Sequence, residues 1–170
     1  LARQASGLAV LTAEAHATGL PDASFQLVTM FDVLEHLDDE GPALAEVQRL
    51  LTPGGAFLFT VPAFMMLWSG HDEALHHRRR YRRGALRRLV EGSGLKVDWI
   101  SYYNASLFPP VAAIRLARRV IGGGAKSADV GQTSGWPAQL LEGVFAAERH
   151  VVGRVPLPFG VSLIGVARNP

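Results

Sequence analysis

The sequence predicts an α/β fold built around a parallel sheet, and three observations lead to this expectation. The chain has 170 residues, of which 48% are hydrophobic, enough for one compact domain with a real core. Two apolar runs, 25–34 and 56–63, flank a segment with helical periodicity, which gives the order strand, helix, strand. Strands joined through a helix in this way are normally parallel.

The first elements are short apolar runs. Leu8–Thr12, "LAVLT", is consistent with a buried strand, and a loop from Gly19 follows it. "FQLVTMFDVL", Phe25 to Leu34, is rich in β-branched and aromatic residues and predicts a second strand.

The next segment, "DDEGPALAEVQRLLTPGG", predicts a helix. Asp38 or Asp39 can cap it and Pro42 suits its first turn. We expect Pro53-Gly54-Gly55 to stop it. "AFLFTVPA", Ala56 to Ala63, is continuously apolar, as expected of a strand covered on both faces. The apolar residues on one face of the helix are Leu44, Val47, Leu50 and Leu51.

The second half of the chain continues the alternation of helices and strands. The expected elements are a helix at Gly84–Glu91, a strand at Lys96–Tyr103, a helix at Ala105–Ile121, a loop at Gly122–Pro137, a helix at Ala138–Val152 and a last strand at Gly160–Arg168.

Composition excludes several classes of protein. The chain has no cysteine, so disulfides and thiolate metal sites are excluded. The apolar stretch 50–68 is interrupted by proline and glycine and cannot be a membrane-spanning helix, so we expect a soluble, cytoplasmic protein. The formal net charge is only +2, but seven of the fifteen arginines lie between Gly70 and Arg88.

Polar side chains gather where the second predicted strand ends. Three polar residues stand at the end of this apolar run, namely Asp32, Glu35 and His36. The interior of a buried strand would not tolerate them. In open parallel sheets ligands bind at the carboxyl ends of the strands, so we expect a cleft here.

Residues 20–63, "LPDASFQLVTMFDVLEHLDDEGPALAEVQRLLTPGGAFLFTVPA", resemble the middle of the class I S-adenosylmethionine-dependent methyltransferases. The downstream "LWSGHDEALHHRRRY" and "LPFGVSLIGVAR" resemble a bacterial subgroup of that family. The resemblance implies a doubly wound, Rossmann-like, mostly parallel sheet of order 3-2-1-4-5-7-6 with an antiparallel last strand. It also implies S-adenosyl-L-methionine as cofactor.

By this resemblance "LAVLT" is strand 3, so the chain lacks strands 1 and 2 and their glycine-rich turn. A sheet without its central strands would leave unpaired backbone groups, each costing about 1–3 kcal/mol. We therefore expect roughly 40–60 further N-terminal residues in the functional molecule. The expected division is 1–103 for the methyltransferase core (strands 3 to 6), 104–159 for a helical insertion that covers the substrate, and 160–170 for the last core strand.

The resemblance also assigns the cofactor-binding residues, namely Glu14, Ala15, Phe31, Asp32, Val33 and Leu34. Methyl transfer to a hydroxyl is accelerated by a base with a pKa near neutrality, and histidine is the side chain with such a pKa. We expect His36 to be this base, with His71 and His77 behind it. Some relatives bind a divalent ion with an acid-x-x-Glu-His cluster; because Asp32 is shorter than the usual Glu, no residue is assigned as a metal ligand.

The arginine-rich stretch is expected to form a substrate-side wall, with Trp68, Arg79, Arg80 and Tyr81 facing an anionic acceptor. A basic start to the next helix, paired with Asp72 and Glu73, is the simpler alternative. The sparse aromatic residues argue against nucleic acid.

The expected function is methyl transfer to a small-molecule or lipid-linked acceptor, at oxygen. The arginine-rich helix 105–121 could also contact a membrane surface. A non-enzymatic basic module that binds RNA or an anionic partner is the competing class. The sequence does not fix the oligomeric state.

Overall fold

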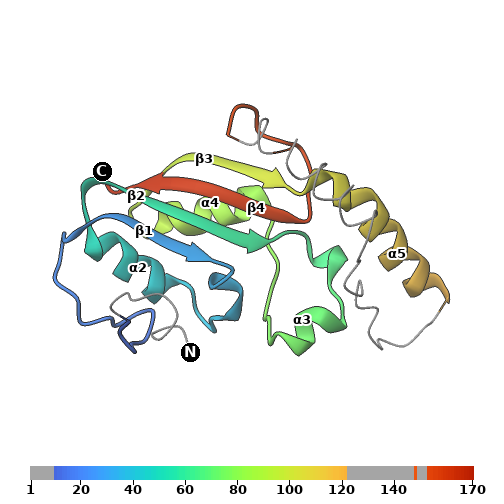
Figure 1. The fold of residues 1–170 in the computed structure, drawn as a ribbon, viewed down its shortest axis with the longest axis horizontal. Helices are drawn as coiled ribbons and strands as arrows, with labels where there is room; N and C mark the ends of the chain where they lie inside the picture. Colours follow the sequence, from blue (N-terminus) through green and yellow to red (C-terminus); the bar gives the residue numbers. More distant parts are fainter. Residues whose placement is uncertain (1–9, 122–147, 149–152) are drawn as a thin grey trace.

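A computed structural model describes residues 10–121, 148 and 153–170 (Figure 1). Its centre is a four-stranded sheet of order β1-β2-β4-β3. β1 (Phe25–Phe31) runs parallel to β2 (Leu51–Pro62), whereas β4 (Ser162–Arg168) is antiparallel to β2 and to β3 (Lys96–Tyr103). The predicted order 4-5-7-6 with an antiparallel last strand is confirmed.

The last strand of the chain fits between β2 and β3 because it carries a glycine where space is smallest. A Cβ atom on Gly165 would lie 2.5 Å from Cζ of Phe59 and 2.9 Å from Cγ1 of Ile100. Gly165 pairs with these same two residues, one on each neighbouring strand. The absent side chain therefore lets the bulky neighbours meet across β4.

Two helices cover one face of the sheet. α2 (Gly41–Leu50) and α4 (Arg83–Gly92) pack against β2, β3 and each other, as the apolar spacing of each helix predicted. The core between them and the sheet includes Leu44, Val47, Phe57, Phe59, Val61, Leu86 and Val90, each at most 1% exposed.

The remaining helices lie beyond the carboxyl ends of β1 and β2 (Figure 1). They are η1 (Leu34–His36), η2 (Met65–Leu67), α3 (Gly70–Ala74), η3 (Ala105–Leu107) and α5 (Phe108–Ile121). The predicted helices 84–91 and 105–121 and the predicted strands 25–34, 56–63, 96–103 and 160–168 are thus confirmed, with shifted ends. The predicted loop 122–137 and nearly all of the predicted helix 138–152 lie outside the described residues.

Two local predictions are wrong. Residues 10–12 of the strand expected at 8–12 form no strand and pair with none, while Leu8 and Ala9 lie outside the described residues. Leu51 and Pro53–Gly55 do not end α2 but belong to β2, because the backbone at Leu51 already pairs with Phe25. Gly54 and Gly55 instead exchange backbone hydrogen bonds with Asn169.

β1 forms the outer edge of the described sheet. Its apolar side chains are unusually accessible, with Leu27 55% and Phe31 54% exposed. Ala56 and Leu58 of β2 are half-buried, so the strand predicted to be covered on both faces is fully covered on one face within the described residues. Among the helices described, none is long and apolar enough to cross a membrane.

The close approach at Gly165 predicts a sharp steric limit. Gly165→Ala should destabilise the protein by about 1–3 kcal/mol, because the added Cβ would overlap Phe59 and Ile100, which are both buried in the core. Gly92→Ala is the matched control: nothing lies within 4 Å of its added Cβ. Urea unfolding measures both, and equal stability of the two variants would contradict this account of β4.

Candidate functional site

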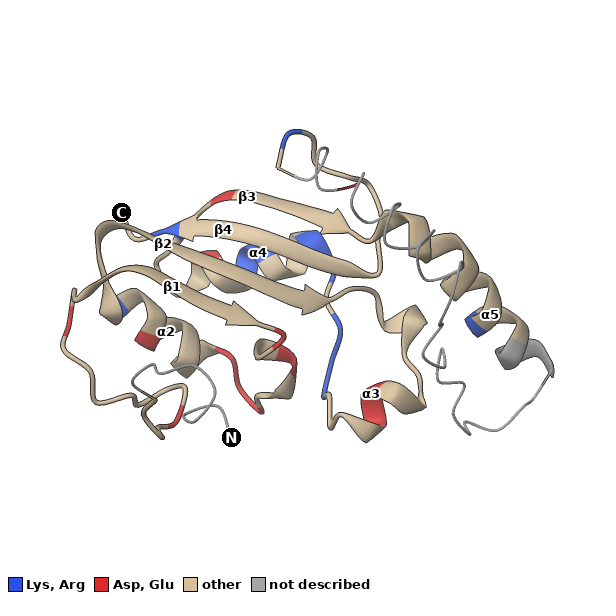
Figure 2. Cartoon of the chain, in the orientation of Figure 1, with Lys and Arg blue, Asp and Glu red and all other residues tan. Residues whose placement is uncertain are grey.

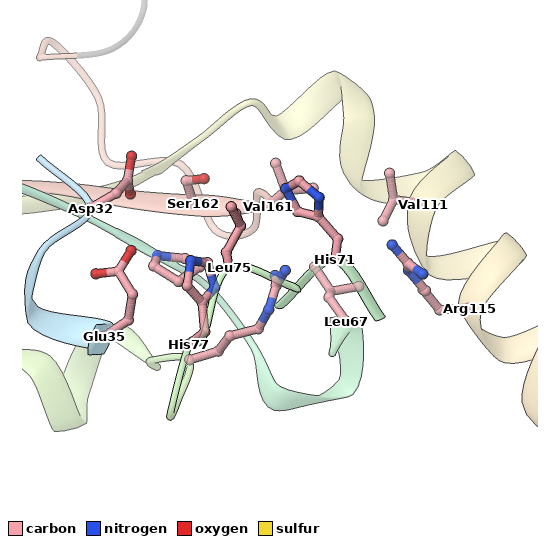
Figure 3. A pocket seen from close by; sticks show the side chains of 12 residues that line it. Asp32, Glu35, Leu67, His71, Leu75, His77, Val111, Arg115, Val161 and Ser162 are labelled. Carbon is pink, nitrogen blue, oxygen red and sulfur yellow. The ribbon is translucent and has the colours of Figure 1, made fainter. Parts of the chain in front are cut away.

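A pocket of about 290 Å³ opens at the carboxyl ends of β1 and β2 (Figure 3). Its walls come from η1, the segment 62–80, α5 and the residues that start β4. This is the edge of the sheet where the sequence predicted a cleft. The lining residues are Asp32, Glu35, Pro62, Leu67, His71, Leu75, His77, Arg80, Val111, Arg115, Val161 and Ser162.

Asp32 stands at the turn between β1 and η1. Its backbone has a positive φ of 51°, and its N–H donates to the carbonyl oxygen of Thr60 at 3.0 Å. This bend ends β1 and leaves the Asp32 carboxylate exposed at the pocket. Of its predicted companions, Phe31 is 54% exposed, Val33 is half-buried and Leu34 is fully buried in the core.

Glu35 is the most unusual side chain in the pocket. It is fully buried, and neither carboxylate oxygen has a hydrogen-bond partner among the described residues. Burial, together with the charges of Asp32 and Asp72, raises its pKa from 4.5 to about 7, although its own backbone hydrogen bond and Arg80 oppose the shift. A buried carboxylate without a partner costs free energy, so it is suited to receive a donor or a cation.

Asp72 fixes the pocket wall that the segment 62–80 forms. Ser69 and Asp72 form a capping box at the start of α3, in which Asp72 Oδ2 accepts the Ser69 N–H at 2.9 Å. Arg80 binds both carboxylate oxygens, at 2.7 and 3.0 Å. Burial alone would raise the pKa of Asp72, but the hydrogen bonds from Arg80 and His77 lower it below its usual value.

The other members of the arginine-rich stretch pair with the segment that leads into α2. Arg79 donates to Glu40 at 2.7 Å and to the carbonyl oxygens of Leu37 and Asp38. The Tyr81 hydroxyl also donates to Glu40, at 2.8 Å. Figure 2 shows the basic segment before α4 and the acidic segment after β1. Neither Arg79 nor Tyr81 lines the pocket, so their predicted substrate-binding role stays a prediction, and their observed partners are internal.

The three predicted histidines differ in setting. His36 and His71 are exposed, whereas the side chain of His77 is only 9% exposed, and its Nδ1 lies 3.0 Å from Asp72 Oδ1. Both His71 and His77 line the pocket (Figure 3). The rings of His36 and His77 meet edge to face at 4.8 Å. Ligand atoms of Glu35, His36 and His77 lie within 4.8 Å of one another, a donor set that a divalent cation could occupy.

The remaining predicted residues lie outside this pocket. Glu14 is exposed and Ala15 half-buried in a turn closed by the Ala17 N–H and the Glu14 carbonyl oxygen. The turn is tied to α2 through Thr18, which donates twice to Glu46. Trp68 donates weakly to Glu73 at 3.4 Å.

Several pocket residues were not assigned from the sequence. Asp72 does not line the pocket but holds the lining residues His77 and Arg80, and it had a usable signal, because Ser69-x-x-Asp72 is the spacing of a capping box. Glu35 was noted only as part of a polar cluster; nothing in the sequence marks it as unpartnered. Val111, Arg115 and Ser162 come from elements that meet the pocket only in the folded chain.

Comparison with known sequences agrees with the resemblance noted above. Residues 1–59 match the family described as "Methyltransferase domain". A probable S-adenosylmethionine-dependent methyltransferase of Mycolicibacterium smegmatis is 38% identical over 81 residues, which are 46% of this chain and 32% of that protein. A dimethylglycine N-methyltransferase of Parasynechococcus marenigrum is 51% identical over 43 residues, 25% of this chain and 15% of that protein. The chain thus spans a third or less of these curated relatives.

The fold has close parallels among solved structures. A putative sarcosine dimethylglycine methyltransferase from Galdieria sulphuraria superposes with a TM-score of 0.57 over 99% of this chain and 62% of that one, at 16% identity. This likeness establishes the fold. Together with the sequence matches it confirms the resemblance to class I methyltransferases and the Rossmann-like α/β fold class.

The raised pKa of Glu35 predicts a specific dependence of stability on pH. The folded protein holds this proton more tightly than the unfolded chain, so the contribution is complete below about pH 4.5 and is lost as pH rises through about 7. Glu35→Gln, which mimics the protonated acid, should escape this loss. Between pH 4.5 and 8 the wild type should lose up to about 3 kcal/mol relative to the variant. Parallel stability curves for the two proteins, from urea unfolding at each pH, would refute the assignment.

Proposed function

We propose that this chain, which has the fold of the class I S-adenosylmethionine-dependent methyltransferases and resembles them in sequence, binds that cofactor and methylates a small-molecule acceptor. The observation that carries the proposal is the pocket at the carboxyl ends of β1 and β2, lined by two carboxylates and two histidines. When bound, the cofactor supplies a methyl group activated by a sulfonium.

The residues present fit a cofactor with a cationic amino acid portion. Asp32 offers an exposed carboxylate held at the pocket by the bend after β1, and Glu35 offers a buried one without a partner. A carboxylate binds an ammonium group by charge-assisted hydrogen bonds. We therefore assign cofactor binding to Asp32, with Phe31, Val33 and Leu34 shaping the turn that carries it.

The chain's own part in methyl transfer is to hold the acceptor and receive its proton. Positioning of the reacting atoms supplies most of the rate enhancement in such displacements. His77 is better placed as a base than His36, because it lines the pocket and is held by Asp72, whereas His36 does not line it. The sequence led us to expect oxygen as the acceptor atom, and the relative named for N-methylation makes nitrogen the alternative.

The charges of the described residues favour an enzyme over a basic binding module. Arg78, Arg79 and Arg80 pair with Asp38, Glu40 and Asp72, so much of the basic stretch is neutralised within the fold. An RNA-binding surface would instead present such a stripe to phosphates. A lipid-linked acceptor and a peripheral contact of α5 with membranes stay predictions.

Calorimetric titration of the purified protein with S-adenosylhomocysteine tests the proposal. We expect micromolar binding, and Asp32→Asn should weaken it by about tenfold because a charge-assisted hydrogen bond is lost. Asp98→Asn is the matched control, since Asp98 pairs with an exposed arginine at 2.7 Å outside the pocket around Asp32. Absence of binding by the wild type, or equal binding by both variants, would contradict the assignment.

A further inference from the structure

We propose that Asp72 is a positioning residue that fixes His77 as the neutral Nδ1–H tautomer and thereby aims its Nε2 lone pair at the pocket as the proton acceptor. This inference rests on the proposed function, and it concerns a residue outside the predicted catalytic and binding set. It is carried by the contacts of Asp72, by the place of His77 in the pocket wall and by the unpartnered Glu35.

The Asp72 carboxylate is fixed on every side. It is fully buried, and the backbone N–H and hydroxyl of Ser69 donate to Oδ2 at 2.9 and 3.2 Å. Arg80 donates from Nε and Nη2 to the two oxygens, and its third contact, from Nη1 to the carbonyl oxygen of Ala63, fastens it to the end of β2. A carboxylate held by so many donors stays ionised and cannot rotate away.

His77 meets this carboxylate through one defined nitrogen. Nδ1 lies 3.0 Å from Asp72 Oδ1, and the His77 backbone N–H donates to the Asp72 carbonyl oxygen at 2.8 Å. Because an ionised carboxylate can only accept, Nδ1 must carry the hydrogen. In the neutral ring Nε2 then has the free lone pair.

The pocket side of the ring is open to a donor. No hydrogen bond of Nε2 is found among the described residues, and His77 lines the pocket beside Glu35 (Figure 3). A ring nitrogen of His77 lies within 4.8 Å of a carboxylate oxygen of Glu35. A proton bound to the His77 ring therefore lies near two buried carboxylates, those of Asp72 and Glu35. Of these two, Asp72 is already paired with Arg80.

In the proposed methyl transfer, each bond that forms is matched by a bond that breaks. The acceptor's O–H or N–H bond breaks and its proton binds to Nε2 of His77, giving an imidazolium that donates to Asp72 through Nδ1. The electron pair left on the acceptor atom would form the bond to the methyl group that the cofactor would supply, with the sulfonium leaving as the neutral sulfide. His77 then releases its proton to water.

Nitrogen-15 NMR of the ligand-free protein measures the tautomer directly, in the presence of a chelator and at about two pH units above the ordinary histidine pKa of about 6.5. We expect His77, assigned with a His77→Gln variant, to carry hydrogen on Nδ1 and none on Nε2. The exposed His36 and His71 serve as internal references. A wild-type His77 protonated on Nε2 would overturn the proposal without any variant.

Asp72→Asn should reverse the tautomer. Ser69 and Arg80 bring three donors to the Oδ2 position, whereas Oδ1 meets Arg80 Nε and His77, so the Asn oxygen should take the Oδ2 position. Its NH₂ group should then face Nδ1 of His77 and displace the Nε contact of Arg80. Nδ1 must then accept, and the hydrogen moves to Nε2. Asp98→Asn, which removes an Asp–Arg pair of the same 2.7 Å length elsewhere, should leave His77 unchanged. If Asp72→Asn does not fold, the wild-type spectrum decides.

Diethylpyrocarbonate distinguishes an aimed lone pair from a purely structural hydrogen bond, because it acylates accessible neutral imidazole nitrogen. Mass spectrometry should find His77 modified in the wild type and in Asp98→Asn, and modified at least about tenfold more slowly in Asp72→Asn. An unreactive wild-type His77, or equal reactivity in Asp72→Asn, would refute the proposal. Failure of S-adenosylhomocysteine binding with the expected tautomer and reactivity would instead refute the proposed function.

Discussion

The buried ion pair between Asp72 and Arg80 is the contact on which the site depends. The segment 69–81 has little regular structure of its own beyond the short helix α3, so its conformation comes from its partners. Asp72 closes the capping box of α3, while Arg80 ties the segment back to the end of β2. A buried charge that loses its partner is strongly destabilising, so the two residues can only be accommodated together.

A second pairing extends this arrangement to the other wall. Glu40 accepts from both Arg79 and Tyr81, and the backbone of Arg78 donates to the Glu35 carbonyl oxygen. The basic segment is therefore joined to the start of α2 and to η1, on the opposite side of the pocket from α5. The three consecutive arginines 78–80 each bind a different carboxylate. These ion pairs fix the course of the segment across the strand ends.

These pairings change the chemical character of the pocket. From its composition the stretch looked like a binding surface for an anionic acceptor, yet four of its seven arginines pair with carboxylates of the same chain. Among the buried side chains that the structure describes, the one without a hydrogen-bond partner is the Glu35 carboxylate, which lies beside His36 and His77. Such a pocket is better suited to groups that donate hydrogen bonds or carry positive charge than to a phosphate.

The sequence by itself determined the four strands of the sheet and the three longer helices. Apolar periodicity located β1, β2, β3, β4, α2, α4 and α5, because burial of one face fixes these patterns residue by residue. The resemblance supplied the strand order and the antiparallel last strand. The predicted strand at 8–12 and the end of α2 were less secure, since pairing partners and not local preference decide where a strand exists or begins.

The tertiary structure alone decided which polar residues share a site. Asp72 and Arg80 are eight positions apart and Glu40 and Arg79 thirty-nine, and no local rule relates the members of either pair to each other. Asp32, Glu35 and the cleft were predictable because a parallel sheet brings strand ends to one edge. That Glu35 has no hydrogen-bond partner among the described residues follows from packing between distant segments, which one-dimensional spacing does not encode. That His77 rather than His36 is held by a carboxylate follows from the turn after α3, which brings the ring back to Asp72 five positions earlier.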